Sequence, residues 1–156
     1  MEDKISERIK QTEEFIETCR RKSGLGTLNA PESEKYVNAT AAELNKMDSE
    51  ELSEAAVALN RCALYINGLL NKATATKNWC QSNLDSLIAK QFTEYDPYLP
   101  AKIKTSLCVQ NNELAKKLQK FIVELELVID SLTQTPLFLN NLSYSYNKLA
   151  DRKRRA

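Results

Sequence analysis

The clearest feature of the sequence is one apolar stripe that repeats at alternating steps of four and three residues. The stripe consists of Leu52, Ala56, Leu59, Ala63, Ile66, Leu70, Ala73, Lys77, Cys80, Leu84 and Leu87. Such spacing is typical of a helix in a coiled-coil-like pair, and no proline interrupts it. Asp48 and Glu51 form a capping-box pattern just before it. The sequence therefore predicts one helix from residue 49 to about residue 91.

A second stripe with the same steps follows after a turn. Residues 93–100 hold two prolines and an Asp-Pro step, which predict a turn, and Pro100 can open the next helix. The second stripe consists of Ile103, Leu107, Gln110, Leu114, Leu118, Phe121, Leu125, Val128 and Leu132. Further apolar residues at Ile122, Leu127 and Ile129 predict deeper burial in the second half of this helix. Two long helices joined by a short turn predict an antiparallel hairpin.

Other helices are expected before the hairpin. Apolar residues at helical spacing, namely Ile5, Ile9, Phe15, Ile16 and Cys19, predict a helix over residues 3–22. Gly24 is expected to be its C-cap, and residues 23–30 indicate a loop or hinge. Pro31 fits the first turn of a second helix, which continues through Tyr36, Val37, Ala41 and Leu44.

A short helix is expected after the hairpin. Thr135-Pro136 ends the second long helix, and Thr135 is a candidate cap for the last one. The apolar stripe of this last helix is predicted to consist of Phe138, Leu142, Tyr146 and Leu149. The chain then closes with a basic tail at residues 152–155.

Together these patterns predict an all-α protein: a long antiparallel, coiled-coil-like helical hairpin with shorter N-terminal and C-terminal helices. We expect residues 1–47 to form an acidic N-terminal helical segment, and residues 48–156 to form the hairpin, the short last helix and the tail. Only three glycines and four prolines occur in 156 residues, which is few for a chain built of turns and short strands. No apolar run approaches the roughly 18 residues of a membrane span. With no secretory signal at the N-terminus either, a cytoplasmic protein is expected.

The composition argues against catalysis. The chain contains no histidine, which removes the commonest general base and the commonest metal ligand. No glycine-rich phosphate-binding motif and no GxSxG nucleophile motif occurs. We therefore expect a protein that is not an enzyme, without catalytic residues, metal site, cofactor or small-molecule substrate.

The four cysteines allow two interpretations. Cys19, Cys62, Cys80 and Cys108 form no CxxC pair. In a reducing cytoplasm they are expected to be reduced thiols that act as buried or half-buried small apolar side chains. A redox or metal-binding role is the alternative.

Charge is unevenly distributed along the chain, although the net charge is only +1. Residues 1–54 hold 8 Lys and Arg against 13 Asp and Glu, whereas residues 55–156 hold 14 against 8. Cations can neutralise phosphates, and aromatic rings among them can stack on single-stranded bases. The candidate nucleic-acid-binding residues are Lys72, Lys77, Trp79, Lys102, Lys104, Lys116, Lys117, Lys120, Arg152, Lys153, Arg154 and Arg155.

These candidates also have simpler interpretations. Lysines off an apolar stripe usually form a solvated face, and Trp79, one position from the stripe, can be a residue at the edge of the core. The arginine-rich tail can be a disordered, solubilising end. The acidic first part of the chain could contact a basic protein or cover the basic half of a neighbouring subunit.

The length of the first stripe suggests contacts between chains. A helix on the order of 60 Å long, at 1.5 Å per residue, cannot bury its stripe within a compact globule. We therefore expect a homo-oligomer, although an intramolecular bundle would produce the same pattern. The candidate interface residues are Leu52, Leu59, Ile66, Leu70, Leu114, Phe121 and Leu125.

Residues 52–150 resemble the recombination mediator proteins of T-even-like phages (the UvsY type). The resemblance consists of the Ala/Leu-patterned segment LSEAAVALNRCALYINGLLNK, the break EYDPYLP, Lys104-Thr105-Ser106-Leu107 at the start of a second apolar helix, and a final helix near Pro136-Leu137-Phe138. It implies a small all-helical protein that forms ring-like oligomers and binds single-stranded DNA. It also implies a role in loading a recombinase onto DNA that is coated by single-strand-binding protein.

Two functions thus stand as hypotheses. The first is a non-enzymatic oligomer that binds single-stranded DNA and recombination proteins. The second is a structural helical assembly protein, such as a virion, scaffold or adaptor component, that binds no nucleic acid. An enzyme or small-molecule regulator is the least supported third class, because the chain lacks histidine and glycine-rich loops.

Overall fold

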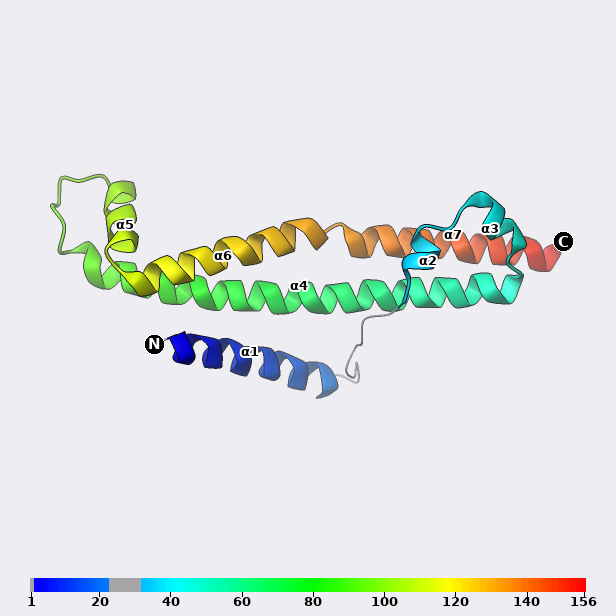
Figure 1. Ribbon diagram of the computed structural model, residues 1–156, viewed down its shortest axis with the longest axis horizontal. Coiled ribbons are helices and arrows are strands. Elements are labelled where there is room, and N and C mark those ends of the chain that lie inside the picture. Colours follow the sequence, from blue (N-terminus) through cyan, green and yellow to red (C-terminus); the bar gives the residue numbers. More distant parts are fainter. Residues whose placement is uncertain (1, 23–31) are drawn as a thin grey trace. The chain divides into compact units, whose positions relative to one another are not determined.

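The fold is all-α, as predicted. A computed structural model describes residues 2–22 and 32–156, so the predicted loop at residues 23–30, the Gly24 cap and the role of Pro31 lie outside the described residues. The described helices are α1 (Glu2–Lys22), α2 (Glu34–Val37), α3 (Ala41–Lys46), α4 (Ser49–Phe92), α5 (Ala101–Gln110), α6 (Glu113–Leu132) and α7 (Thr135–Arg155) (Figure 1). They form two compact units, one of residues Met1–Ile16 and Asn71–Asp130, the other of residues Glu17–Leu70 and Ser131–Ala156.

Helix α4 begins where its capping box predicts. The Asp48 side chain accepts hydrogen bonds from the backbone N–H groups of Glu50 and Glu51, at 2.9 and 2.8 Å. The Glu51 carboxylate in turn accepts the backbone N–H of Asp48 at 2.8 Å. These bonds satisfy N–H groups that the first turn of a helix leaves without partners. The predicted helix over residues 49–91 is confirmed, with its end one residue later at Phe92.

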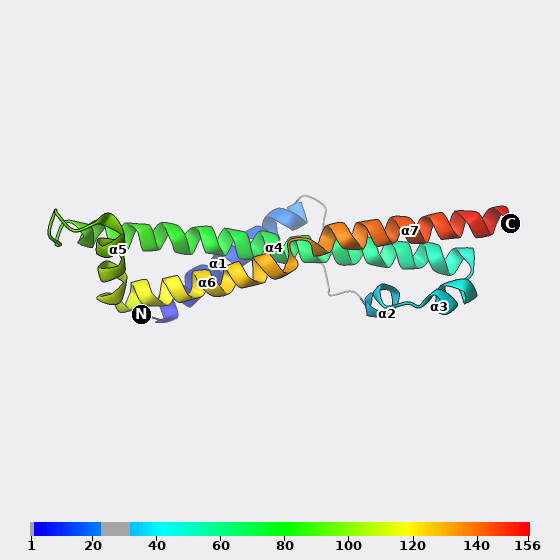
Figure 2. The ribbon, with the colours of Figure 1, turned by 90° about the horizontal axis from the view of Figure 1, so that it is seen from above.

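The second unit is built on the antiparallel pairing of the first part of α4 with α7 (Figure 2). Its core contains Leu52, Ala55, Ala56, Leu59, Ala63, Leu139, Tyr146 and Ala150. Alanines on α4 allow the two backbones to approach, and the buried Ser143 hydroxyl donates a 2.8 Å hydrogen bond to the Ala56 carbonyl. The first half of the predicted stripe is therefore buried against the C-terminal helix of the same chain.

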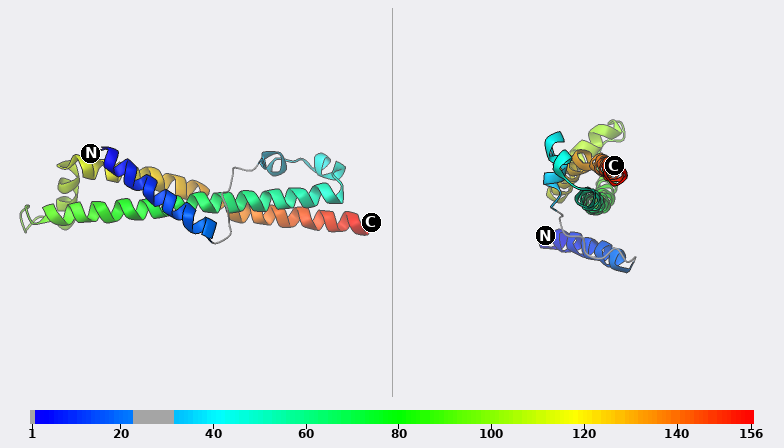
Figure 3. Two further views of the ribbon diagram at one scale, coloured as in Figure 1. Left: turned by 90° about the horizontal axis from the view of Figure 1, so that it is seen from below. Right: turned by 90° about the vertical axis from the view of Figure 1, so that its right-hand side faces the viewer.

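Helices α2 and α3 replace the single helix expected from Pro31 to Leu44. They lie along one side of the α4–α7 pair (Figure 3), and Tyr36, Val37 and Leu44 pack on its core. Thr40 interrupts the helix because it forms a capping box with Glu43: its hydroxyl accepts the Glu43 N–H at 3.3 Å, and Glu43 accepts the Thr40 N–H at 2.7 Å. The hydrogen bonds from the backbone and hydroxyl of Thr40 hold the pKa of Glu43 below its ordinary value.

The first unit is built on the second part of α4 and on α6, which run antiparallel (Figure 1). Its core contains Cys80, Leu84, Val109, Ala115, Leu118 and Ile122. Trp79, Leu87, Leu114 and Phe121 are half-buried around it. The second half of the first stripe and the first half of the second stripe therefore meet in one core, as the hairpin predicts.

The turn between α4 and α5 is stabilised by its own side chains. The Asp96 carboxylate accepts the Tyr98 N–H at 2.9 Å, which forms an Asx-type turn. Pro100 then stands at the N-cap of α5, as expected for the start of the next helix.

The second long helix is broken where the stripe predicted continuity. Helix α5 ends at Gln110 and α6 begins at Glu113, with Asn111 and Asn112 between them. The Asn112 side chain accepts the Ala115 N–H at 3.1 Å, and the Asn111 amide donates to the Tyr95 hydroxyl at 2.8 Å. Asparagine competes with helix continuation by such local bonds.

The last helix also differs from its prediction. Helix α7 has 21 residues and continues to Arg155, so it is not short and its basic end is helical. Thr135 is its first residue, and the N-cap is Gln134, which makes no side-chain capping bond. Leu139 is buried in place of Phe138, which is 54% exposed.

Four further apolar side chains are more exposed than their stripes predicted. Phe15 on α1, Ile103 on α5, and Leu127 and Val128 on α6 are all exposed. Leu127 is on the outer side of α6 because Leu118 and Ile122 already face the core.

Candidate interaction surfaces

Two of the lysines predicted to bind phosphate make contacts with other residues of the first unit. Lys104 is only 8% exposed; its Nζ lies 4.9 Å from the centre of the Phe92 ring and donates to the Pro97 carbonyl at 3.4 Å. It therefore holds α5 against the turn and does not face solvent. Lys77, the polar member of the first stripe, forms a 3.2 Å ion pair with Glu126 on α6.

Trp79 lies at the edge of the core, which is the simpler of its two interpretations. Its side chain is half-buried and packs against the core of the first unit. Its backbone carbonyl accepts a 2.8 Å hydrogen bond from the Asn83 side chain one turn later. A ring packed in this way contributes to the edge of the core. Lys72, earlier on α4, is also half-buried.

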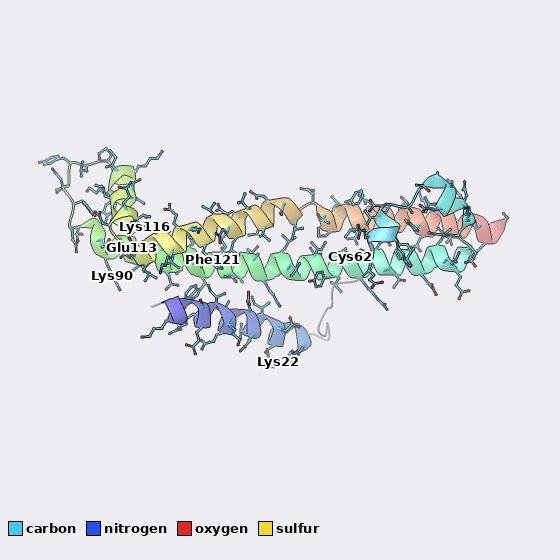
Figure 4. All side chains as sticks on the ribbon, viewed as in Figure 1. Lys22, Cys62, Lys90, Glu113, Lys116 and Phe121 are labelled. Atoms are coloured by element: carbon cyan, nitrogen blue, oxygen red, sulfur yellow. The ribbon has the colours of Figure 1, made fainter. Side chains whose placement is uncertain are left out.

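The first turns of α6 carry the exposed cations Lys116, Lys117 and Lys120. Lys116 pairs with Glu113 at 2.8 Å, and the two side chains lie side by side in Figure 4. This hydrogen bond and the charge of Lys116 lower the pKa of Glu113. Lys120 is 4.0 Å from Glu124. Lys102, on the first turn of α5, is exposed as well, so the first unit retains a group of surface lysines.

The basic end of α7 is partly engaged with the rest of the second unit. The Lys153 ammonium donates to the backbone carbonyls of Leu44, at 3.1 Å, of Asn45, at 2.9 Å, and of Met47. It thereby satisfies carbonyls that the C-terminus of α3 leaves open. The Lys153 ammonium is therefore engaged within the second unit, and its predicted contact with phosphate would compete with these hydrogen bonds.

Of the neighbouring arginines, one makes contacts within the second unit and two are exposed to solvent. Arg154 donates to the Ser53 hydroxyl at 2.8 Å and lies 3.5 Å from Asp151. Arg152 and Arg155 are exposed. Because α4 and α7 are antiparallel, this basic end belongs to the same unit as the acidic first turns of α4, at Glu50, Glu51 and Glu54.

Folding therefore mixes the charges that the sequence separates. The second unit combines 9 acidic with 11 basic residues, and the first combines 12 acidic with 11 basic. Each unit draws on both the acidic and the basic part of the sequence, since residues 17–70 associate with residues 131–156. Neither unit has the strongly positive balance that the second half of the sequence has alone.

The positions expected at an oligomer interface are mostly packed within the chain. Leu52 and Leu59 have no exposed surface, so neither is available to a second copy. Ile66 packs against the core of the second unit, and Leu114 and Phe121 pack against that of the first. Leu70 and Leu125 are half-buried. In this single chain the stripe is covered by α7 in the second unit and by α6 in the first, which corresponds to the intramolecular alternative.

A different set of apolar residues is exposed on the outer sides of the helices. Val57 and Leu64 on α4 are 50% and 40% exposed, and Leu137 and Tyr144 on α7 are 59% and 61% exposed. Val123 and Leu127 on α6 are 50% and 66% exposed. None of these six positions was predicted to be exposed, and Leu127 was expected to be buried. Their signal was the seven-residue spacing of 57 and 64, and of 137 and 144, beside the main stripes.

The cysteines follow the apolar interpretation where they are described. Cys80 and Cys108 are buried and Cys62 is half-buried, and all three are free thiols. Burial raises the pKa of the Cys80 thiol above its ordinary value. The side chain of Cys19 lies outside the described residues.

The described residues also provide evidence on two other kinds of site. Among residues 2–22 and 32–156, no group of three or more His, Cys, Asp and Glu side chains is arranged to hold a metal ion. In the same part of the chain, no helix is both long and apolar enough to cross a membrane. Comparison with protein-family models, with curated proteins and with solved structures finds no match to this chain.

Proposed function

We propose that this protein is a non-enzymatic helical assembly protein that acts by docking copies of itself and other helical proteins. The observation that carries the proposal is the second set of apolar residues on the outer faces of α4, α6 and α7. Their inner stripes are already buried in the two cores. A helix with apolar residues on two faces is typical of one that packs on both sides.

The charge distribution favours this function over phosphate binding. Lys77, Lys104, Lys153 and Arg154 are engaged by Glu126, Pro97, the end of α3 and Ser53, respectively. Moving them to a phosphate would break contacts within the fold. A near balance of acidic and basic residues in each unit also reduces the attraction of a polyanion.

Analytical ultracentrifugation of the wild-type chain tests the assembly function. We expect a weight-average mass above that of one chain, which increases with concentration up to about 100 µM, the range in which weak protein contacts form. A mass of one chain throughout this range would overturn self-assembly. Adding about 1 M salt should preserve an association driven by apolar contact.

Binding of single-stranded DNA, as in recombination mediators, is the second candidate. It is supported by the exposed lysines at positions 102, 116, 117 and 120 in the first unit. Fluorescence anisotropy with a labelled single strand, at about 50 and about 200 mM salt, provides the test. Binding by phosphate contacts should fall by orders of magnitude between these salt concentrations.

The test variant changes Lys102, Lys116 and Lys117 to Gln together. The control is the single substitution Lys148→Gln on α7. The triple change should weaken DNA binding, whereas Lys148→Gln should leave it unchanged. Absence of binding at low salt would exclude this second candidate and leave the assembly function standing.

A further inference from the structure

The outer side of α6 carries a short apolar ridge that its own core leaves uncovered. Val123 and Leu127 are one helical turn apart and therefore lie on one face. They are 50% and 66% exposed, whereas Leu118 and Ile122 on the inner side are 2% and 5% exposed. The ridge thus points away from the core formed with α4.

The charges along this face are ordered. Three- and four-residue steps from the ridge lead to Lys120 and Lys116 toward the start of α6, and to Asp130 toward its end. All three side chains are exposed. The face thus has Lys116 and Lys120, flanked by Glu113 and Glu124, at one end, the apolar pair in the middle and Asp130 at the other end.

We propose that this face docks the same face of a second copy of the chain in an antiparallel, twofold-symmetric contact. An antiparallel pair centred on position 125 brings Val123 opposite Leu127 of the second copy. The same register brings Lys120 opposite Asp130 of the second copy. Both contacts occur twice, because a twofold interface uses the same patch on both copies. A parallel pair would instead place Lys120 beside Lys120 and Asp130 beside Asp130, so the charge order selects the antiparallel arrangement.

The surface has a place for the opposing leucine. A shallow hollow of about 520 Å³ is lined by Lys116, Gln119, Lys120, Val123 and Glu124. In the antiparallel register, Leu127 of the second copy lies opposite Val123 at the edge of this hollow, where it packs between side chains of the facing helix, and Asp130 of the second copy lies over its centre, opposite Lys120. The methylene stems of the two lysines add apolar surface around that leucine while their ammonium groups stay in water.

This inference deepens the proposed assembly function and rests on it, because it names the partner and the face. The apolar part of the contact is two residues from each copy. The contact is therefore a weak and reversible one, of the kind made by small interfaces. Other exposed faces remain available for further partners.

Cysteine cross-linking tests the register. Val123→Cys and Leu127→Cys are made as separate variants, one with a longer tag, and are oxidised alone and as a mixture. Antiparallel pairing predicts disulfides mainly between the two different variants, because position 123 faces position 127. Peptide mapping by mass spectrometry identifies the linked cysteines, and the wild-type chain gives the background from its native thiols. Equal or greater cross-linking of each variant with itself would overturn the register.

Charge exchange tests the face without disturbing the core. Lys120→Glu alone and Asp130→Lys alone should each weaken self-association about three- to tenfold, because each makes both symmetry-related pairs like-charged. The double variant should recover it, because each contact again joins opposite charges. Lys90→Glu on α4 makes the same charge change away from this face and should have no effect. Circular dichroism checks that all variants keep the wild-type helix content.

The outcomes separate this inference from the assembly function. If the wild type is an oligomer and neither Lys120→Glu nor Asp130→Lys weakens it, the α6 face is rejected while the assembly function stands. A wild-type chain that remains a monomer would reject both.

Discussion

The Tyr146 hydroxyl donates a 2.6 Å hydrogen bond to the backbone carbonyl of Tyr36, and the two rings meet edge to face with their centres 6.3 Å apart. Tyr146 is 2% exposed and lies in the core between α4 and α7. Tyr36 is on the short helix α2, which has four residues and would not be stable alone. This pair is therefore a main link between α2 and the helices it covers.

The Tyr146→Phe variant should be less stable by about 1–3 kcal/mol, because the Tyr36 carbonyl would lose a buried donor. The ring stays in place, so the apolar packing is preserved. Urea unfolding followed by circular dichroism measures the change. Tyr144→Phe is the control, since Tyr144 is 61% exposed and its hydroxyl is not in this core. Equal stability of the two variants would show that the hydrogen bond contributes nothing.

Removing the Lys153 ammonium should loosen α2 and α3 while α4 and α7 remain paired. The Lys153→Met variant keeps the length of the side chain but leaves the carbonyls of Leu44, Asn45 and Met47 without their donor. We expect a loss of about 1.5–3 kcal/mol, as for hydrogen bonds that involve a charged group. Hydrogen exchange should become faster in residues 34–47. Lys148→Met is the control, because the Lys148 ammonium lies over the exposed Tyr144 ring, 4.6 Å from its centre. Unchanged exchange in residues 34–47 would mean that Lys153 does not hold α3.

Local patterns explain which parts of this fold can be predicted. The start of α4 follows from Asp48 and Glu51 because a capping box needs only residues three apart. The breaks after α2 and after α5 are harder to predict. After α5, for example, the spacing of the apolar stripe continues without interruption across Asn111 and Asn112, from Leu107 to Leu114. Asparagine is tolerated within helices, so the end of α5 at Asn111 depends on neighbours such as Tyr95, whose hydroxyl accepts a hydrogen bond from the Asn111 amide.

The candidate surfaces are harder to predict than the helices. A lysine looks the same in sequence whether it faces water or, like Lys153, bonds to carbonyls more than a hundred residues away. Hydrophobicity alone also does not separate a core residue from an outward-facing one. Leu127 was expected to be buried because it widens the apolar face of α6, yet the hairpin can cover only one side of that helix.

The break between α5 and α6 should depend on the Asn112 side chain. Asn112→Ala removes the acceptor of the Ala115 N–H, and loss of an N-cap costs about 1 kcal/mol. Asn112→Asp keeps an oxygen at the same place and should be as stable as the wild type. Thermal unfolding of the two variants compares them directly. If alanine and aspartate have the same effect, the break is set by the packing of Ala115 and Leu118 instead.

Alkaline pH should destabilise the fold through two groups that burial keeps protonated. Burial raises the pKa of Cys80 above its ordinary 9.0, and burial is also the first cause that raises the pKa of Tyr146 above its ordinary 10.0. Below about pH 8 both groups are protonated in the folded and the unfolded chain, so they add no pH dependence. Above the ordinary pKa the unfolded chain releases the proton and the folded chain keeps it, so stability falls.

Each group contributes a slope of up to about 1.4 kcal/mol per pH unit, between its ordinary and its raised pKa. Urea unfolding at a series of pH values from about 7 to about 11 measures this slope for the wild type, Cys80→Ala and Tyr146→Phe. Each substitution lowers stability at pH 7 but should make the alkaline slope shallower, because one titrating group is gone. This separates the titration from simple loss of packing, which lowers stability equally at every pH. An alkaline slope that is the same in all three proteins would show that neither Cys80 nor Tyr146 causes it.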